Sequence, residues 1–301
     1  MDERRVADSA AAFRLEPGRV RASFERASGS YESAAALQAR VAGELLGRLA
    51  EFRFAPGAVL DLGAGTGRVT RELKRRYRRA LVVALDLAPG MLREARRHLR
   101  PWRRFARLCG DAQRLPLADA SVDLVFSSLM LQWCQPLDVA LREVRRVLRP
   151  SGFFAFATFG TDTLGELRAA WAEADGYTHV NHFPDVQEVG DALVRAGLME
   201  PVLDVDRIQM DYADALSLMR DLKAIGAHNV TAGRPRALAG RARLARMQQA
   251  YESFRRAGRL PATYEIVYGA CWGAAGRTAA PVSAGVARIA PGSIGRARAQ
   301  P

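Results

Sequence analysis

The first strong pattern along the chain is an apolar residue at every fourth position, which begins after Tyr31 with Leu37, Val41, Leu45 and Leu49. This spacing is typical of an amphipathic helix with one buried face. The pattern ends at Pro56-Gly57, and a short apolar run at 58–62 then leads into the glycine-rich segment 63–67. Helical periodicity resumes beyond it, so we predict a helix, a strand, a tight turn and a second helix.

The same alternation of short apolar runs and helical stretches continues through the chain. We predict further strands at 81–85, 105–108, 122–127, 152–159, 202–210 and 263–271, and helices at 89–99, 137–148, 187–196, 214–226 and 240–257. Strands that alternate with helices form right-handed crossovers, which place the helices on both faces of a parallel sheet. We therefore expect an α/β fold with a doubly wound, mostly parallel seven-stranded sheet.

Composition and segment boundaries refine this picture. The chain has 301 residues, of which 49% are hydrophobic and 26% charged, as in globular proteins. No apolar run approaches the roughly 20 residues of a membrane span, and the N-terminus lacks a signal-peptide core. We expect a cytoplasmic protein with an extension at 1–22, one domain at 23–276 that includes a helical lid at 212–260, and a disordered basic tail at 277–301.

Positive charge is concentrated in one part of the chain. The formal net charge is +13, and residues 71–107 hold 13 Arg and Lys against three Asp and Glu. An excess of this kind suits an acidic partner. It equally suits an arginine-rich surface that is only solvated, and the sequence leaves both interpretations open.

Candidate chemistry begins with the segment that follows the first predicted strand, Asp61-Leu62-Gly63-Ala64-Gly65-Thr66-Gly67. Glycines at a strand-to-helix turn let a ligand approach the backbone closely. The spacing G-x-G-x-G, with an acid two positions before it, differs from the G-x-G-x-x-G typical of NAD sites. Asp86 ends the second predicted strand and Asp111 follows the third. Because the carboxyl ends of parallel strands lie at one edge, these acids should line one site.

These three motifs together resemble those of class I S-adenosylmethionine-dependent methyltransferases, which have a Rossmann-like fold. The resemblance implies that Asp61, Gly63, Ala64, Gly65 and Gly67 hold the methionine half of S-adenosylmethionine, with Asp86 on the ribose and Asp111-Ala112 on the adenine. It also assigns Gln38, Leu87, Met91 and Ser127 to the cofactor.

Two other classes of site are disfavoured. His179 and His182 stand three residues apart with no Cys or further His nearby, so we expect no metal. The segment after the fourth strand, Ser127 to Cys134, lacks the Asn/Asp-Pro-Pro-Tyr of amino-methylating nucleic acid enzymes, and no Pro-Cys nucleophile is present. We therefore expect no nucleic acid partner.

Segments outside the common motifs indicate which family of methyltransferases the chain resembles. Residues 24–38, 131–134, 221–234 and 261–264 resemble the malonyl-acyl-carrier-protein O-methyltransferases of biotin synthesis, and the match runs from about 20 to 273. The resemblance implies methyl transfer to the free carboxylate of a malonyl thioester, carried by acidic acyl-carrier protein or by coenzyme A. The resulting methyl ester would prime pimeloyl synthesis, and the family's N-terminal helix and lid would cover the site.

Two alternatives stay open. The segments at 159–164 and 261–264 also resemble a respiratory complex I assembly factor, which has a methyltransferase fold and is described as a protein-arginine hydroxylase. A cofactor-binding protein without catalysis is the other. The sequence does not indicate an oligomeric state.

The acceptor site follows from the expected chemistry. A malonyl carboxylate is ionised at pH 7, so it needs no general base. Removing an anion from water costs several kcal/mol unless a cation or hydrogen-bond donors compensate. The candidate residues are Tyr31 on the N-terminal helix, Gln132 and Trp133 after the fourth strand, and Lys223, His228 and Arg234 in the lid.

Overall fold

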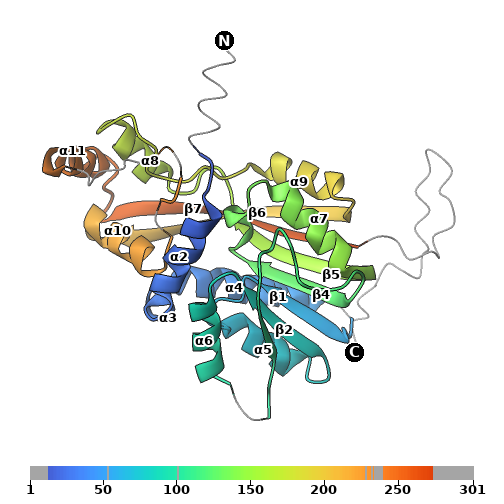
Figure 1. Cartoon of the computed structure of the whole chain (residues 1–301). Coiled ribbons are helices and arrows are strands. Elements are labelled where there is room, and N and C mark those ends of the chain that lie inside the picture. Colours follow the sequence, from blue (N-terminus) through green and yellow to red (C-terminus); the bar gives the residue numbers. More distant parts are fainter. Residues whose placement is uncertain are drawn as a thin grey trace, which may run out of the picture.

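The computed structural model describes residues 13–273 except 53, 100–101, 228, 232 and 234–239. Its centre is a seven-stranded sheet with the order β3-β2-β1-β4-β5-β7-β6 (Figure 1). The first five strands are parallel, and β7 pairs antiparallel with both β5 and β6. This architecture confirms the predicted doubly wound α/β fold.

Each predicted strand is present. The strands are β1 (Ala58–Leu62), β2 (Leu81–Asp86), β3 (Ala106–Cys109), β4 (Val122–Ser128), β5 (Leu148–Phe159), β6 (Met199–Tyr212) and β7 (Leu260–Trp272). Every residue of β1 is buried, as expected for a central parallel strand covered on both faces. The β5, β6 and β7 strands are longer than the apolar runs that predicted them. Antiparallel pairing between β6 and β7 continues beyond the buried residues, and the start of β5 pairs with β4 at Val122 and Leu148.

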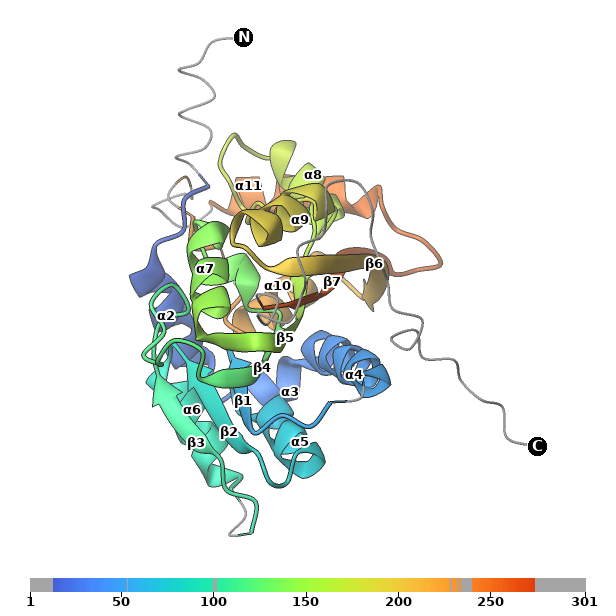
Figure 2. The same ribbon diagram turned by 90° about the vertical axis from the view of Figure 1, so that its right-hand side faces the viewer.

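Helices cover both faces of the sheet (Figure 2). One face is covered by α4 (Ala36–Glu51), α5 (Arg68–Arg76) and α6 (Pro89–Arg97). The other is covered by α7 (Leu137–Val147) and α9 (Val186–Arg195). The helices after β1 and β2 thus share one face, as right-handed crossovers require.

A helix that the sequence did not predict, α2 (Pro17–Ala27), lies against α6 and crosses the boundary drawn at residue 22 (Figure 1). Its Glu25 carboxylate accepts a hydrogen bond from the Gly90 N–H at 2.6 Å, and its Ser23 hydroxyl donates to the Gly226 carbonyl at 2.8 Å. The short α3 (Tyr31–Ala34) follows it. The N-terminal segment therefore joins α6 to the lid.

The lid lies between β6 and β7, and contains α10 (Ala215–Ala224) and α11 (Arg241–Glu252), which packs on α8 (Gly165–Ala172). Its described part excludes two predicted acceptor ligands, His228 and Arg234. The predicted tail at 277–301 also lies outside the described residues. Among the helices that the structure describes, none is long and apolar enough to cross a membrane.

Candidate active site

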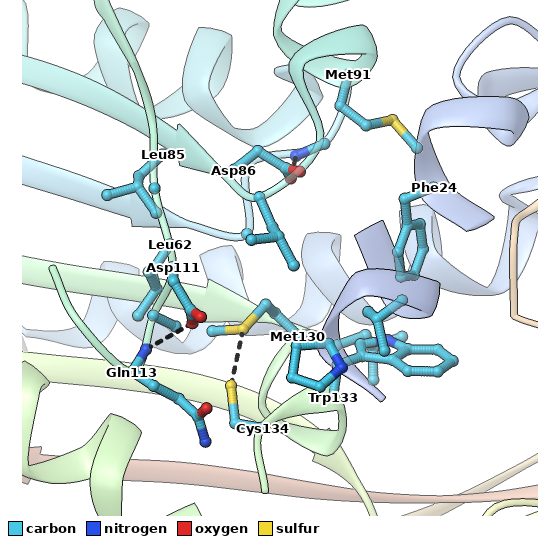
Figure 3. Close-up of a pocket in the computed structure, with 18 of the residues that line it drawn as sticks. Phe24, Leu62, Leu85, Asp86, Met91, Asp111, Gln113, Met130, Trp133 and Cys134 are labelled. Atoms are coloured by element: carbon cyan, nitrogen blue, oxygen red, sulfur yellow. Dashed lines mark hydrogen bonds between the residues drawn. The ribbon is translucent and has the colours of Figure 1, made fainter. Parts of the chain in front are cut away.

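A cavity of about 880 Å³, a volume that includes its opening to solvent, lies at the carboxyl ends of β1, β2 and β4 (Figure 3). The structure places seven residues predicted to hold the cofactor along its wall: Gly63, Gly65, Asp86, Leu87, Met91, Asp111 and Ala112. The Asp111 carboxylate accepts a hydrogen bond from the Gln113 N–H at 2.9 Å (Figure 3). Helix α2 covers the cavity with Val20 and Phe24. We call this space the adenosine cavity.

A smaller cavity of about 500 Å³ continues from the first on the other side of the glycine loop. Tyr31, Gly63 and Gly65 line both cavities, and Asp61 and Ala64 line only the second. We call it the methionine cavity. The two cavities are adjacent, because they share the first three of these residues and Ser128, and we call them together the cofactor space.

The glycines of the loop have different roles. Gly63 has a φ of +79°, and a Cβ there would lie 2.3 Å from Met130 Cγ, so this glycine is required by packing. Gly67 likewise packs against Ala95, and lies outside the cavities. Gly65 has a φ of +53°, and the nearest atom to a Cβ there is Tyr31 Cε1 at 3.9 Å. Only at Gly65 does the missing side chain leave room for a ligand.

Two carboxylates, Asp61 buried and Asp86 partly buried, give this space its electrostatic character. Asp86 accepts hydrogen bonds from the Gly65 N–H at 2.8 Å and the Ala88 N–H at 2.9 Å, yet burial raises its pKa to about 6. Asp61 accepts a hydrogen bond from the Thr70 hydroxyl at 2.5 Å and is 2% exposed. Burial, and secondarily the charge of Asp86, raises the pKa of Asp61 to about 7.

Such a site suits a cationic ligand that also carries hydroxyl donors. Two neighbouring carboxylates repel each other, and a bound cation relieves that repulsion. S-adenosylmethionine has a sulfonium, an ammonium group and two ribose hydroxyls, and each carboxylate oxygen has a lone pair free for one more hydrogen bond. The residues present therefore fit this cofactor. The described residues hold no group of three His, Cys, Asp or Glu that could bind a metal ion.

A third cavity, of about 1140 Å³, lies between α8 and α10 and borders the other two. It shares Trp133 with the adenosine cavity and Gln38 with the methionine cavity. Its walls are mostly apolar, and include Leu167, Met219 and Leu222. We call it the acceptor cavity, because a second substrate bound there would meet the cofactor at Trp133 and Gln38.

Polar groups of this cavity include two without a partner. The buried Gln38 Oε1 and Asn181 Oδ1 atoms have no hydrogen bond to any described residue. A buried polar atom without a partner is costly, and because both atoms are acceptors the missing partner is a donor, such as a water molecule or an N–H group of a ligand. Gln38 was expected to touch only the cofactor, whereas it lies where the cofactor and acceptor cavities meet.

His179, which the sequence suggested only as a possible metal ligand, lines the acceptor cavity. His179 Nε2 lies 2.8 Å from Asp175 Oδ1, and the imidazole stacks on Trp171 with ring centroids 3.7 Å apart. Arg243 Nη1 lies 3.5 Å from the other oxygen of Asp175. The spacing of Asp175 and His179, four residues apart, was the available signal, but it gives no indication of a cavity.

Three predicted site residues lie elsewhere. Gln132 uses both ends of its amide inside the protein, donating to the Leu129 carbonyl at 2.7 Å and accepting from Thr158 at 3.3 Å. Ser127 is buried and donates to the Leu62 carbonyl, and its neighbour Ser128 lines the cofactor space instead. Lys223 is exposed and lies outside the acceptor cavity. None of these three side chains lines one of the three cavities, so the described structure does not bring them into the site.

The sheet order, the glycine loop and the acidic cofactor space define a class I S-adenosylmethionine-dependent methyltransferase. Residues 60–156 match the family described as "Methyltransferase domain". The chain is 52% identical over 274 residues to the malonyl-[acyl-carrier protein] O-methyltransferase of Laribacter hongkongensis, covering 88% of this chain and 92% of the relative. It is 48% identical to that of Methylovorus sp., covering 91% and 94%. The chain belongs to the malonyl-[acyl-carrier protein] O-methyltransferase family.

Solved structures agree on the fold. The YcgJ protein of Bacillus subtilis superposes with a TM-score of 0.54 at 17% identity, covering 78% of this chain and 99% of that chain. Phosphoethanolamine N-methyltransferase 2 of Haemonchus contortus, solved with S-adenosylmethionine, gives a TM-score of 0.52 at 13% identity, covering 83% and 57%.

Proposed function

We propose that this enzyme transfers a methyl group from S-adenosylmethionine to the free carboxylate of a malonyl thioester on acyl-carrier protein. The product is the malonyl methyl ester, which serves as primer for the pimeloyl chain of biotin. The observation that carries the proposal is the acceptor cavity, which meets the cofactor space at Gln38 and Trp133. The names of the relatives supply the acceptor. The predicted cytoplasmic location belongs to the same proposal.

The acceptor cavity supports a reaction without a general base. The malonyl carboxylate is already ionised at neutral pH, so it attacks the methyl carbon without losing a proton. The cofactor supplies the methyl group when it is bound. The protein holds the carboxylate in line with that group, and the apolar walls of the cavity exclude water.

Among the described residues of the acceptor cavity, the groups that can hold the carboxylate are neutral hydrogen-bond donors. Among the described residues that line the acceptor cavity there is no Lys or Arg, and the one ionisable cation is His179, next to Asp175. The candidate donors are the side-chain amide N–H groups of Gln38 and Asn181 and the indole N–H of Trp133, because all three residues line this cavity. These donors replace the hydrogen bonds that the carboxylate made to water. Because they carry no fixed positive charge, they do not bind the charged substrate more strongly than the transition state, in which that charge is being lost.

The proposal is tested by incubating the enzyme with methyl-labelled S-adenosylmethionine and malonyl-carrier protein. The expected product is a carrier that carries label as a base-labile ester. Acetyl-carrier protein is the control, because it lacks the free carboxylate and should receive no label. Label that resists base, or no label on malonyl-carrier protein, would contradict a carboxyl methyltransferase. Hydroxylated arginine in a protein substrate would point instead to the hydroxylase alternative.

A further inference from the structure

Helix α10 has two faces of opposite character. Its inner face contributes Met219 and Leu222 to the wall of the acceptor cavity. Its outer face exposes Leu216, Arg220 and Lys223, which are spaced as i, i+4 and i+7 and so form one stripe. One helix thus separates the acceptor cavity from a cationic surface with an apolar residue at one end.

The two cations of this stripe are available to a partner. Within the described part of the chain, neither Arg220 nor Lys223 forms a salt bridge, and the hydrogen bonds of Arg220 go to the Leu216 carbonyl and the Ser217 hydroxyl of its own helix. The pKa of Asp214, the N-cap of this helix, is lowered by the Ser217 N–H and also by the charge of Arg220, so these two charges interact without a salt bridge. The neighbouring acid, Asp221, interacts with the Tyr212 hydroxyl. The lid sequence as a whole, 212–260, holds ten Arg and Lys against three Asp and Glu. The stripe therefore lies in a segment with a net positive charge.

The basic cluster at 71–107, which dominates the charge distribution of the sequence, is a weaker candidate for docking. Four of its arginines are bound by carboxylates of the same chain: Arg71 by Glu32, Arg75 by Glu72, Arg93 by Glu25 and Arg97 by Glu94. Helices α5 and α6 also pack on β1, β2 and β3, whereas α10 contacts β6 at the opposite edge of the sheet (Figure 1). None of the described residues of this cluster lines the acceptor cavity.

We propose that the acidic carrier protein docks on the outer face of α10, at Leu216, Arg220 and Lys223, and not on α5 and α6. This inference rests on the proposed function, because it takes the carrier as the partner. A carrier presents its acyl group at the end of a flexible arm, so it must dock beside the cavity that receives the group. The stripe on α10 offers charge complementarity at that place, and complementary charges on a docking surface act mainly by speeding encounter.

The test compares two double variants with the same change in charge. Arg220→Glu/Lys223→Glu reverses the stripe on α10, and Arg75→Glu/Arg96→Glu reverses one exposed arginine on each of α5 and α6. Each variant is assayed at low salt with malonyl-carrier protein and with malonyl-pantetheine, which has neither the carrier nor its charge. Fluorescence anisotropy of a labelled carrier measures binding independently of turnover.

The α10 variant should raise KM for malonyl-carrier protein about tenfold or more, weaken carrier binding similarly and flatten the salt dependence. It should leave malonyl-pantetheine turnover within twofold, and the α5/α6 variant should behave as the unchanged enzyme. A larger effect of the α5/α6 variant, no effect of either, or an equal loss with both substrates would overturn the inference. Failure of the unchanged enzyme to methylate either thioester would instead contradict the proposed function, and the anisotropy comparison would still judge the docking surface.

Discussion

Replacing Asp61 with Asn should stabilise the ligand-free protein while weakening its affinity for the cofactor. Asp61 is 2% exposed, and its pKa rises from an ordinary value of 3.8 to about 7. Its carboxylate is therefore harder to ionise in the folded protein than in the unfolded chain. Asn keeps the shape of the side chain and can still accept the Thr70 hydrogen bond, but it carries no charge to bury.

The magnitude follows from the two pKa values. A tenfold change in an equilibrium constant corresponds to about 1.4 kcal/mol, so the shift from 3.8 to about 7 corresponds to at most about 4 kcal/mol at pH 8. The sign is that of a raised pKa: the folded state holds the proton more tightly, so stability is lost as pH rises from about 4 through about 7. Asp61→Asn should recover much of this loss at pH 8 and little of it near pH 4.

Urea unfolding of both proteins at pH 8 and pH 4.5 measures the effect, and calorimetry should show at least about tenfold weaker S-adenosylmethionine binding. Asp123→Asn is the matched control with the opposite sign. Although burial raises it, the pKa of Asp123 is lowered overall by Arg149 and by the Gly57 and Ala58 N–H groups, so Asp123→Asn should destabilise the protein at pH 8. No gain in the free energy of unfolding for Asp61→Asn at pH 8, or an equal gain at both pH values, would refute the reasoning.

Three further predictions concern the same site. Asp86→Ala should weaken S-adenosylmethionine binding at least about tenfold in calorimetry, because each charge-assisted hydrogen bond to a ribose hydroxyl is worth about 1.5–3 kcal/mol, and unchanged affinity would remove Asp86 from the site. Lys223→Ala should keep kcat/KM for malonyl-pantetheine within about twofold, since Lys223 is exposed. A decrease of kcat/KM by about a hundredfold would instead indicate that Lys223 binds the substrate carboxylate. Asn181→Asp places a negative charge in the acceptor cavity, so it should raise KM for malonyl-pantetheine at least about tenfold, and the uncharged Asn181→Ser should raise KM less. Equal KM values for the two variants would place the substrate carboxylate elsewhere.

The pH dependence of cofactor binding provides an independent check. Burial raises the pKa of Asp86 to about 6 and that of Asp61 to about 7, and a cationic ligand binds the ionised forms. Affinity for S-adenosylmethionine should therefore fall as pH decreases from 8 to 5.5. A flat profile for the unchanged enzyme would indicate that both carboxylates are already ionised across this range.

The sequence by itself determined where the strands lie along the chain and where the cofactor motifs stand relative to them. Strand and helix periodicities depend on neighbouring residues along the chain, and each of the seven strands lies where an apolar run predicted it. The carboxyl ends of parallel strands meet at one edge, so acids at or just after the ends of successive strands converge there whatever the details of packing. Asp61, Asp86 and Asp111 all line the cofactor space for this reason.

Only the tertiary structure decided what surrounds those motifs. Helix α2 is short, and Val20 and Phe24 are its large apolar residues, so its sequence has little helical periodicity. It covers the adenosine cavity through contacts with α6 and with the lid, which lie far from it along the chain. The acceptor cavity is assembled from residues as distant as Gln38 and Tyr264. Whether a polar side chain points into a cavity, as that of Asn181 does, or outward, as that of Lys223 does, depends on which elements pack against its own. The periodicity of a segment does not depend on which distant elements pack against it. The acceptor site could therefore be identified only from the tertiary structure.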